Sequence, residues 1–404
     1  MKGTGASLAA RRAMHFVLLV GVLSFFADCT HEGARSVLGP WLGTMGASAT
    51  AIGIVVGFGE LLGYGLRVVS GKLADASRQF WPITITGYVV QMSSVPLLAL
   101  VHSWQAAAVL IVLERTGKAI RNPPRDVMLA SAAKRIGGYG WAFGIHEAFD
   151  QFGAMVGPLV VAGIIASHGA YRLAFAALAV PAFINLCFVG LARISFPRPQ
   201  DLEQREAALP VADRYPSEYW IYLAGAGLVA AGFADYPLIA YHWSIHHIVP
   251  TDWVPLLYAV AMAVSGGASL VLGRLFDRFG FRVLIALTII AAAFAPLVFL
   301  SGRIEYAVLG AALWGMGMGV HESIIPAAVA PMVSRARRAS AFGVFTAVYG
   351  VCWFAGSALI GWIYDRSIAG TVIFCVISQL LALPVFIRVS RRKGAQQEPG
   401  TADD

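Results

Sequence analysis

The chain has 404 residues, of which 58% are hydrophobic and only 13% are charged, and its mean hydropathy is +0.70. This composition excludes an ordinary soluble globular protein and is typical of a protein that crosses a membrane many times. The formal net charge of +8 is accounted for by basic loops beside a membrane, so we expect no nucleic-acid partner.

A bilayer core of about 30 Å needs about 20 apolar residues per helix. By that measure the sequence predicts an all-α membrane protein with twelve transmembrane helices. The spans are expected near 13–42, 49–70, 81–102, 105–133, 140–166, 171–195, 218–246, 252–273, 282–302, 305–333, 339–364 and 369–388. Basic residues gather in the loops on the side of the N-terminus, whereas the opposite loops hold only Arg172, Arg303 and Arg366. The positive-inside rule therefore places both termini in the cytoplasm, and we expect a multi-pass protein of the inner (cytoplasmic) membrane.

The first span carries many ionisable side chains. Spacings of three and four residues place Ser24, Asp28, His31, Glu32 and Arg35 on one helix face. Asp28 lies about 22 Å along a helix that starts near residue 13, close to the bilayer centre. Because such a stripe is too costly to expose to lipid, we interpret it as the wall of a polar cavity.

Two charged motifs follow the second and the eighth span. We expect a tight turn at the first glycine of each motif, where a helix ends. Each aspartate would then meet a helix N-terminus or an arginine, a contact of about 0.3–1 kcal/mol that can close a gate without locking it. The alternative is a set of solvated loop charges that only fix topology. The residues assigned to gating here are Gly71, Asp75, Arg78, Gly273, Asp277 and Arg278.

The fourth span brings positive charge to mid-depth, with Arg115 and Lys118 on one face. We expect Asp28 or Glu32 to pair with one of these cations when the site is empty. Desolvation and a neighbouring cation act oppositely on a carboxylate's affinity for a proton, so the group can be poised to exchange one. Proton coupling is therefore assigned to Asp28, Glu32 and Arg115. The alternative is a permanent ion pair that only holds helices together.

Further polar and aromatic side chains inside the spans are candidates for substrate contact. They are Lys118, His146, Asp150, Asp235, His242, Trp314, His321 and Glu322. The oxygen, nitrogen and sulfur donors on the first and fifth spans could also bind a divalent ion. Because such spacing is common among polar stripes and no His-rich loop accompanies it, the sequence predicts neither a resident metal nor a cofactor.

The longest connection, 197–217, mixes prolines with charges and is expected to be a cytoplasmic linker. It would separate a six-helix bundle at 1–196 from a second bundle at 218–392, and the tail 393–404 is expected to be disordered. Short stretches repeat between the two parts. The matches are 142–144 with 341–343, Gly157 with Gly356, 26–28 with 233–235, and Gly71 with Gly273. They predict a parallel pseudo-repeat, which suits a carrier with its site between the halves.

On these motifs the chain resembles the major facilitator superfamily over essentially its whole length. The second motif fits the family pattern G-x-L-x-D-R-x-G-x-R, whereas the first has Ala76 and Arg78 where the family has Arg and Gly. Arg115 resembles the family's buried arginine of span four. Gly153-x-x-x-Gly157-Pro158 resembles the gating signature of proton-driven exporters in span five.

The resemblance implies a secondary active transporter that works by alternating access, and we expect proton-coupled export of a small organic molecule. A proton-driven importer and a divalent metal exporter are the alternatives, and a non-transporting sensor on the same fold is the alternative of another class. An enzyme is not expected, because the chain has no Ser/His/Asp set, phosphate-cradling loop or HExxH motif. The expected partners are the substrate, protons and lipid, with the protein as a monomer.

Overall fold

The computed structural model describes residues 2–136, 138–199, 215–329, 332–333 and 338–397. These residues are helical almost throughout, and no strand occurs among them. They form two compact units. Unit 1 comprises Met1–Ala47, Phe58–Ala207 and Ala240–Met262, and unit 2 comprises Ser48–Gly57, Ala208–Ile239 and Ala263–Asp404.

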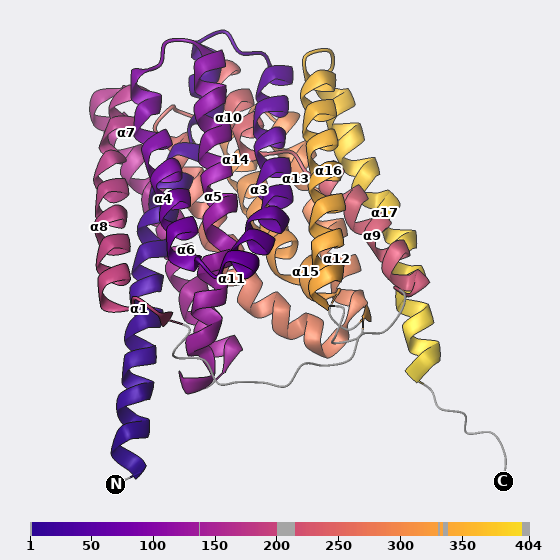
Figure 1. Cartoon of the computed structure of the whole chain (residues 1–404). Coiled ribbons are helices and arrows are strands. Elements are labelled where there is room, and N and C mark those ends of the chain that lie inside the picture. Colours follow the sequence, from indigo (N-terminus) through magenta and orange to yellow (C-terminus); the bar gives the residue numbers. More distant parts are fainter. Residues whose placement is uncertain (1, 137, 200–214, 330–331, 334–337, 398–404) are drawn as a thin grey trace, which may run out of the picture. The chain divides into compact units, whose positions relative to one another are not determined.

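Unit 1 is built around α1, which packs against α4, α5, α6 and α8. One face of α1 packs inward, because every third or fourth residue from Ala13 to Ala27 is apolar and buried. The helices of this unit are α1 (Lys2–Arg35), α2 (Leu38–Thr44), α4 (Phe80–Leu97), α5 (Trp104–Ala133), α6 (Tyr139–His168), α7 (Tyr171–Ala177), α8 (Ala179–Ser195) and most of α10 (Tyr236–Ile245), as Figure 1 shows. Short 3₁₀ turns follow α4 and α5, at Leu98–Leu100 and Lys134–Ile136.

Unit 2 is built around α17 and α16, which both pack against α9, and α12 also packs against α17. Its helices are α9 (Ser217–Ala231), α12 (Phe281–Ala292), α13 (Phe294–Phe299), α14 (Ile304–Gly319), α15 (Ile325–Ala327), α16 (Arg338–Tyr364) and α17 (Ile368–Gln397). A π-helical turn, Val320–Ile324, joins α14 to α15. Because α17 reaches Gln397, the helix continues past residue 393, where the tail was expected to begin. Residues 398–404 of that tail and 200–214 of the expected linker lie outside the described residues.

Besides α10, two long helices divide between the units. These are α3 (Ala49–Ser77), which passes from unit 2 to unit 1 after Gly57, and α11 (Trp253–Phe279), which passes from unit 1 to unit 2 after Met262. Each is packed in its first part and open in its second, since no residue from Glu60 to Val69 and none from 266 to 276 is buried. The two helices follow equivalent expected spans of the pseudo-repeat, so they share one packing pattern as well as one sequence motif.

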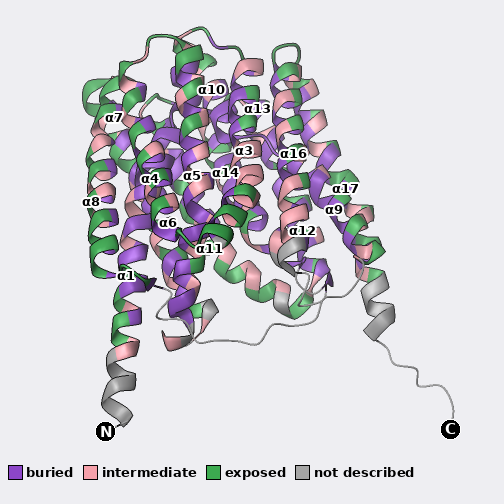
Figure 2. Cartoon of the chain, viewed as in Figure 1, coloured by how far each residue is buried: buried purple, intermediate pink, exposed green. Residues whose placement is uncertain are grey.

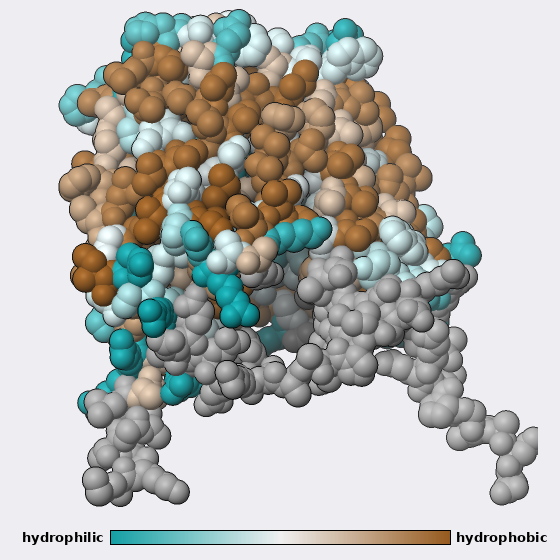
Figure 3. Space-filling view, viewed as in Figure 1, coloured by the Kyte–Doolittle hydropathy of each residue, from teal (hydrophilic) through white to brown (hydrophobic). Residues whose placement is uncertain are grey.

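Ten helical segments among the described residues are long and apolar enough to cross a membrane. They coincide with ten of the twelve expected spans. The other two expected spans correspond to α5 and α14, which are not among the ten. Between Glu114 and Asp126, α5 carries six ionisable side chains, more than an apolar span carries, and α14 has only 16 residues. On the face shown in Figure 3, hydrophobic residues cover the middle of the helices and hydrophilic residues gather at their ends. In unit 1, Figure 2 shows much of the outer face of α8 exposed, and that face carries Val180, Phe183 and Ile194.

Glycines let helices approach to backbone contact at equivalent places in both units. In unit 1, a Cβ on Gly157 of α6 would lie 2.1 Å from the Cys29 carbonyl oxygen of α1. In unit 2, a Cβ on Gly356 of α16 would lie 2.2 Å from the Ala231 carbonyl oxygen of α9. Only glycine permits such spacing between helix axes. The expected match of Gly157 with Gly356 is therefore accompanied by the same kind of packing contact.

The expected span 218–246 is broken, because α9 ends at Ala231 and α10 begins at Tyr236. Side chains donate to carbonyl groups at and beside the break, which stabilises it in an apolar environment. In unit 2, Ser378 Oγ donates to the Leu228 carbonyl at 2.8 Å, Gln379 Nε2 to Gly232 at 3.3 Å, and Trp314 Nε1 to Ala234 at 2.8 Å. Span 13–42 is also broken, between α1 and α2 at Ser36–Val37.

The first turn of α3 is capped from the far end of the chain. In unit 2, Asp365 accepts hydrogen bonds from the backbone nitrogens of Ala49 (3.0 Å) and Thr50 (2.9 Å) and from Thr50 Oγ1 (2.5 Å). A carboxylate there satisfies helix donors that have no partner within the helix and also meets the positive end of the helix dipole.

We therefore expect Asp365→Ala to destabilise the protein by about 1 kcal/mol, the usual effect of losing such a cap. Asp365→Asn, which keeps one acceptor oxygen, should lose less. Thermal unfolding of the detergent-solubilised protein measures both. Equal stability of Asp365→Ala and wild type would show that the cap contributes nothing.

Candidate substrate and proton site

The ionisable stripe of α1 lies inside unit 1. Ser24, His31, Glu32 and Arg35 are all buried, and Asp28 is partly exposed. Their spacing of three to four residues turns them toward α5 and α6, whose polar residues they meet. The helical periodicity therefore identified this set correctly as a stripe that turns inward.

Glu60 of α3 joins two of the arginines. Its Oε1 lies 2.9 Å from Arg115 Nη2 of α5 and 3.2 Å from Arg35 Nη2 of α1. Gly59 makes room for this arrangement, because a Cβ there would lie 2.9 Å from Arg115 Cγ. Arg115 also lies beside Glu114, with Nε 3.7 Å from Oε2. Arg115 is therefore held by Glu60 and Glu114, and not by Asp28 or Glu32 as we expected.

His31 connects two further carboxylates. Its Nδ1 lies 2.9 Å from Glu114 Oε1 and its Nε2 lies 3.5 Å from Glu32 Oε1. Glu32 Oε2 accepts a hydrogen bond of 2.5 Å from the hydroxyl of Tyr258 in the first part of α11, and Arg35 Nη1 is 3.9 Å away. Glu32 thus accepts a hydrogen bond from Tyr258 and has the His31 ring and the Arg35 guanidinium nearby, which supplies the polar partners that a buried carboxylate requires.

Gln91 of α4 links Glu114 to Arg121 by hydrogen bonds. Its Nε2 donates to Glu114 Oε1 at 2.7 Å, and its Oε1 accepts from Arg121 Nε at 2.5 Å. Arg121 Nη1 donates to Tyr88 Oη at 3.2 Å, with the guanidinium carbon 4.6 Å from the centre of the Tyr88 ring. Both Gln91 and Arg121 are almost fully buried, so the amide fixes the direction in which the guanidinium points.

Asp28 lies where this network is most open. Its Oδ1 is 3.5 Å from Lys118 Nζ and 3.7 Å from Arg121 Nη2. The side chain of Asp28 is 13% exposed and that of Lys118 19%, whereas that of Arg121 is 1% exposed. Asp28 and Lys118 therefore meet as expected, but at a distance too long for a strong hydrogen bond.

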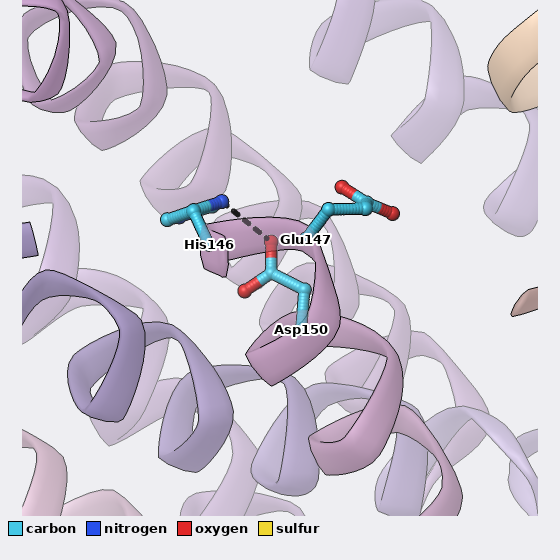
Figure 4. A group of neighbouring side chains, drawn as sticks. All are labelled: His146, Glu147 and Asp150. Carbon is cyan, nitrogen blue, oxygen red and sulfur yellow. Dashed lines mark ion pairs between the residues drawn. The ribbon is translucent and has the colours of Figure 1, made fainter. Parts of the chain in front are cut away.

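A second polar chain runs from α6 to α5. His146 Nδ1 lies 3.5 Å from Asp150 Oδ2, one turn along α6, as Figure 4 shows. His146 Nε2 and Ser24 Oγ are 2.7 Å apart, and Ser24 Oγ accepts from Arg125 Nη1 at 3.2 Å. Arg125 Nη2 in turn lies 2.8 Å from Oδ1 of the partly exposed Asp126. This chain links a buried histidine to the surface of unit 1.

His146, Glu147 and Asp150 each place a possible ligand atom within 4.8 Å of the others. Figure 4 nevertheless shows the Glu147 carboxylate directed away from the His146–Asp150 pair. Glu147 instead accepts a hydrogen bond of 2.9 Å from Gln151 Nε2. A metal ion needs ligands that converge on one point, so this group fits a resident ion poorly.

Asp235 lies in the break between α9 and α10. Its carboxylate accepts hydrogen bonds from Trp353 Nε1 at 3.0 Å and from Ser357 Oγ at 2.5 Å, both on α16. Asp235 therefore fastens the broken helix to α16 within unit 2. Asp28 lies within the unbroken helix α1, so the two aspartates that the sequence matched do not share a local structure.

The other candidates of unit 2 gather around the π-helical turn. His321 is buried, with Nδ1 beside the Tyr349 hydroxyl and its ring centre 4.3 Å from that of Phe233. Trp314 stacks on the same Phe233 ring at 5.7 Å. Glu322 is exposed. The remaining candidate, His242, belongs to unit 1, where its ring packs on that of His246 at 4.6 Å.

The gating motifs lie differently from the expectation. Gly71 and Gly273 are inside α3 and α11, which continue to Ser77 and Phe279, so the expected turns at these glycines are wrong. The turns occur seven residues later, at Arg78 (φ 53°) and Gly280 (φ 60°). The family pattern has glycine at both positions, and the left-handed backbone there gives the physical reason.

The remaining gating candidates are placed as follows. Arg78 and Arg278 are exposed, whereas the side chains of Asp75 and Asp277 lie outside the described residues. Gly153 and Gly157 pack α6 on α1, since a Cβ on Gly153 would lie 2.3 Å from the Phe25 carbonyl oxygen. Pro158 continues the same helix.

Sequence reasoning did not assign a role in the site to several residues that the structure places in it. All but Gln91 carried a signal, because ionisable groups inside apolar spans are functional candidates by default. What the sequence could not show was which helices face one another. The residues are Glu60, Gln91, Glu114, Arg121, Arg125 and Tyr258.

Comparison with known proteins gives one consistent result. The family model described as Major Facilitator Superfamily matches residues 20–324 and 228–403. An uncharacterized protein of Mycobacterium tuberculosis (strain H37Rv) is 38% identical over 391 residues, 95% of each chain. The fosmidomycin resistance protein of Escherichia coli is 32% identical over 130 residues, 32% of this chain and 30% of that protein. Among solved structures, a bacterial homolog of the human lysosomal transporter Spinster, inward-facing and unoccupied, has a TM-score of 0.74 at 14% identity and covers 97% of this chain and 99% of its own.

Proposed function

The chain belongs to the major facilitator superfamily, and from that premise we propose that it is a secondary carrier that exports a small organic molecule in exchange for protons. It is a multi-pass membrane protein of a transporter family, not an enzyme. We place it in the inner membrane as a monomer, with both termini in the cytoplasm. The proposed architecture has twelve spans in two bundles, 1–196 and 218–392, that alternate access to a site between them.

The observation that carries the proposal is the loose contact of Asp28 with Lys118 and Arg121, at 3.5 and 3.7 Å. Each of the carboxylates Glu32, Glu60 and Glu114 has at least one partner at 2.9 Å or closer. A carboxylate that is partly exposed and not tightly held can take and release a proton without dismantling the network. Asp28 therefore fits the role of coupling group best.

Protonation of Asp28 would change how α1 and α5 are held together. In the ionised form, Lys118 and Arg121 share one carboxylate of α1. In the neutral form both cations lose that partner, which gives the two protonation states different preferences for the two orientations of the carrier. If the substrate binds only when Asp28 is ionised, the carrier holds either a proton or the substrate, and the two are exchanged across the membrane.

Two features support the export direction. The Gly153–Pro158 segment resembles the signature of proton-driven exporters and packs directly on the helix that carries Asp28. One relative bears the name of a drug-resistance protein. A specific observation favours the second candidate, proton-driven import: two cations converge on Asp28. An anionic substrate could replace the Asp28 charge there and travel together with the proton that Asp28 takes up.

The test is flux into proteoliposomes with an imposed pH gradient, screened over organic cations, organic anions and divalent metals. We expect a pH gradient to drive uphill movement of one class by wild-type protein and to lose that effect in Asp28→Asn, while downhill movement without a gradient continues. Exposed Glu305, whose ion-pair partner within the described part of the chain is the nearby exposed Arg303, provides the matched control Glu305→Gln, which should behave as wild type. Gradient-driven flux that survives in Asp28→Asn would refute this coupling group. A chain that moves none of the three classes would be the sensor of the alternative hypothesis.

A further inference from the structure

Asp150 differs from the carboxylates of unit 1 that take part in the ion-pair network. Its one ion-pair partner among the described residues is the neighbouring His146 imidazole, at 3.5 Å. Its Oδ1 is buried and accepts no hydrogen bond there. Leaving a buried carboxylate oxygen without a donor is costly. Asp28, Glu32, Glu60, Glu114 and Asp126, by contrast, all contact an arginine or lysine.

The surroundings of Asp150 leave a place for a single positive charge. The charged groups that act on it are Asp28 of α1, Arg121 and Arg125 of α5, and Glu147 of α6. Two are negative and two are positive, so ionised Asp150 adds one negative charge to a set whose formal charges sum to zero. His146 does not supply the missing donor to Oδ1, because its Nδ1 faces Oδ2 and its Nε2 meets Ser24.

We infer that Asp150 binds the positively charged amine group of the transported molecule and takes a proton when that amine leaves. An ammonium group can donate to the unpartnered Oδ1, and a proton can occupy the same oxygen in its place. When the amine binds the protonated form, the proton passes to water and the ammonium takes over the carboxylate's charge. The inference rests on the proposed export, for which it names the substrate class as an organic cation.

An amine fits this position better than a divalent metal. Figure 4 shows the Glu147 carboxylate pointing away from Asp150, so a metal would gain at most the pair of ligands from His146 and Asp150. A doubly charged ion would also exceed the single negative charge that remains near the two arginines. A monovalent ammonium needs only hydrogen-bond acceptors, and Asp150 offers one that is unused.

The experiment is modification of the detergent-purified, full-length protein with dicyclohexylcarbodiimide, which reacts with protonated carboxyl groups in apolar surroundings, followed by mass spectrometry of the peptide that carries Asp150. N,N-Dimethylbenzylamine, benzoate and Zn²⁺ serve as competing probes, the amine being tertiary so that it cannot form an amide with the activated carboxyl group. We expect dimethylbenzylamine to slow the modification of Asp150 by about tenfold, the effect of one charged hydrogen bond. Benzoate and Zn²⁺ should leave the rate unchanged.

Two variants make this result decisive. Glu147→Gln lies on the same helix and should keep both the modification of Asp150 and its protection. Asp150→Asn should lose the modification, and its unfolding temperature checks that it is folded. Absence of modification in wild type, equal protection by benzoate, or protection by Zn²⁺ alone would each overturn the inference. Because no gradient is present, amine protection without proton-driven flux would refute the proposed exchange and leave the amine site standing.

Discussion

Replacing Gly157 with alanine should sharply destabilise the protein, whereas the same replacement at Gly163 on the same helix should not. A Cβ on Gly157 would lie 2.1 Å from the Cys29 carbonyl oxygen, and backbone cannot move aside as a side-chain end can. At Gly163 nothing lies within 4 Å of the added atom. Overpacking costs about 1–3 kcal/mol or more, whereas alanine in a helix is favoured over glycine by about 0.5–1 kcal/mol.

The measurement is thermal unfolding of both variants in one detergent, together with the yield of folded protein. The two substitutions add the same methyl group to the same helix, so they should change stability in opposite directions. Gly356→Ala in unit 2 should behave like Gly157→Ala, because it meets the Ala231 carbonyl oxygen at 2.2 Å. If Gly157→Ala unfolds at the wild-type temperature, α6 and α1 are not in backbone contact in solution.

Glu60→Gln should cost about 3–5 kcal/mol of stability, the usual effect of breaking a buried ion pair from one side. The carboxylate is the shared partner of Arg115 at 2.9 Å and of Arg35 at 3.2 Å. A neutral amide removes a close negative charge from both of these buried guanidinium groups. The ion pairs of Arg115 with Glu114 (3.7 Å) and of Arg35 with Glu32 (3.9 Å) are longer. Unlike the glycine variant, this one should retain the packing of its helices and lose the electrostatic balance of the site.

A double-mutant cycle separates this effect from a general loss of stability. Glu60→Gln combined with Arg115→Gln should lose clearly less than the sum of the single variants, because the second change removes one of the stranded charges. Glu305→Gln, at the exposed Arg303 pair, should leave stability nearly unchanged. Strict additivity of Glu60→Gln and Arg115→Gln would mean that the two side chains are not coupled.

The helical periodicity of the first span predicted the charged stripe because an α-helix fixes which side chains share a face. The meeting of Asp28 with Lys118 followed from that stripe and from the position of Lys118 at similar depth. The partner of Arg115 could not be predicted in this way. Glu60 reaches it from α3 only because Gly59 lets α3 come close, and such proximity is a property of packing between helices.

The breaks and turns were the least predictable parts of the fold. The run from 218 to 246 is apolar enough to read as one span, and the interruption before Tyr236 is stabilised by Trp314, Ser378 and Gln379, far away in sequence. The turns occur at Arg78 and Gly280, seven residues after the glycines where we expected them, because a glycine by itself does not end a helix. The helices end where the backbone becomes left-handed, at Arg78 and Gly280.

The division of α3 and α11 between the two units has a consequence for biosynthesis. The ribosome completes Glu32 and the start of α3 long before it makes Tyr258 and Asp365. Until those residues emerge, Glu32 lacks its hydroxyl donor and the amides of Ala49 and Thr50 lack their acceptor. The first half of the nascent chain therefore lacks two of its hydrogen-bond partners until the second half has been translated.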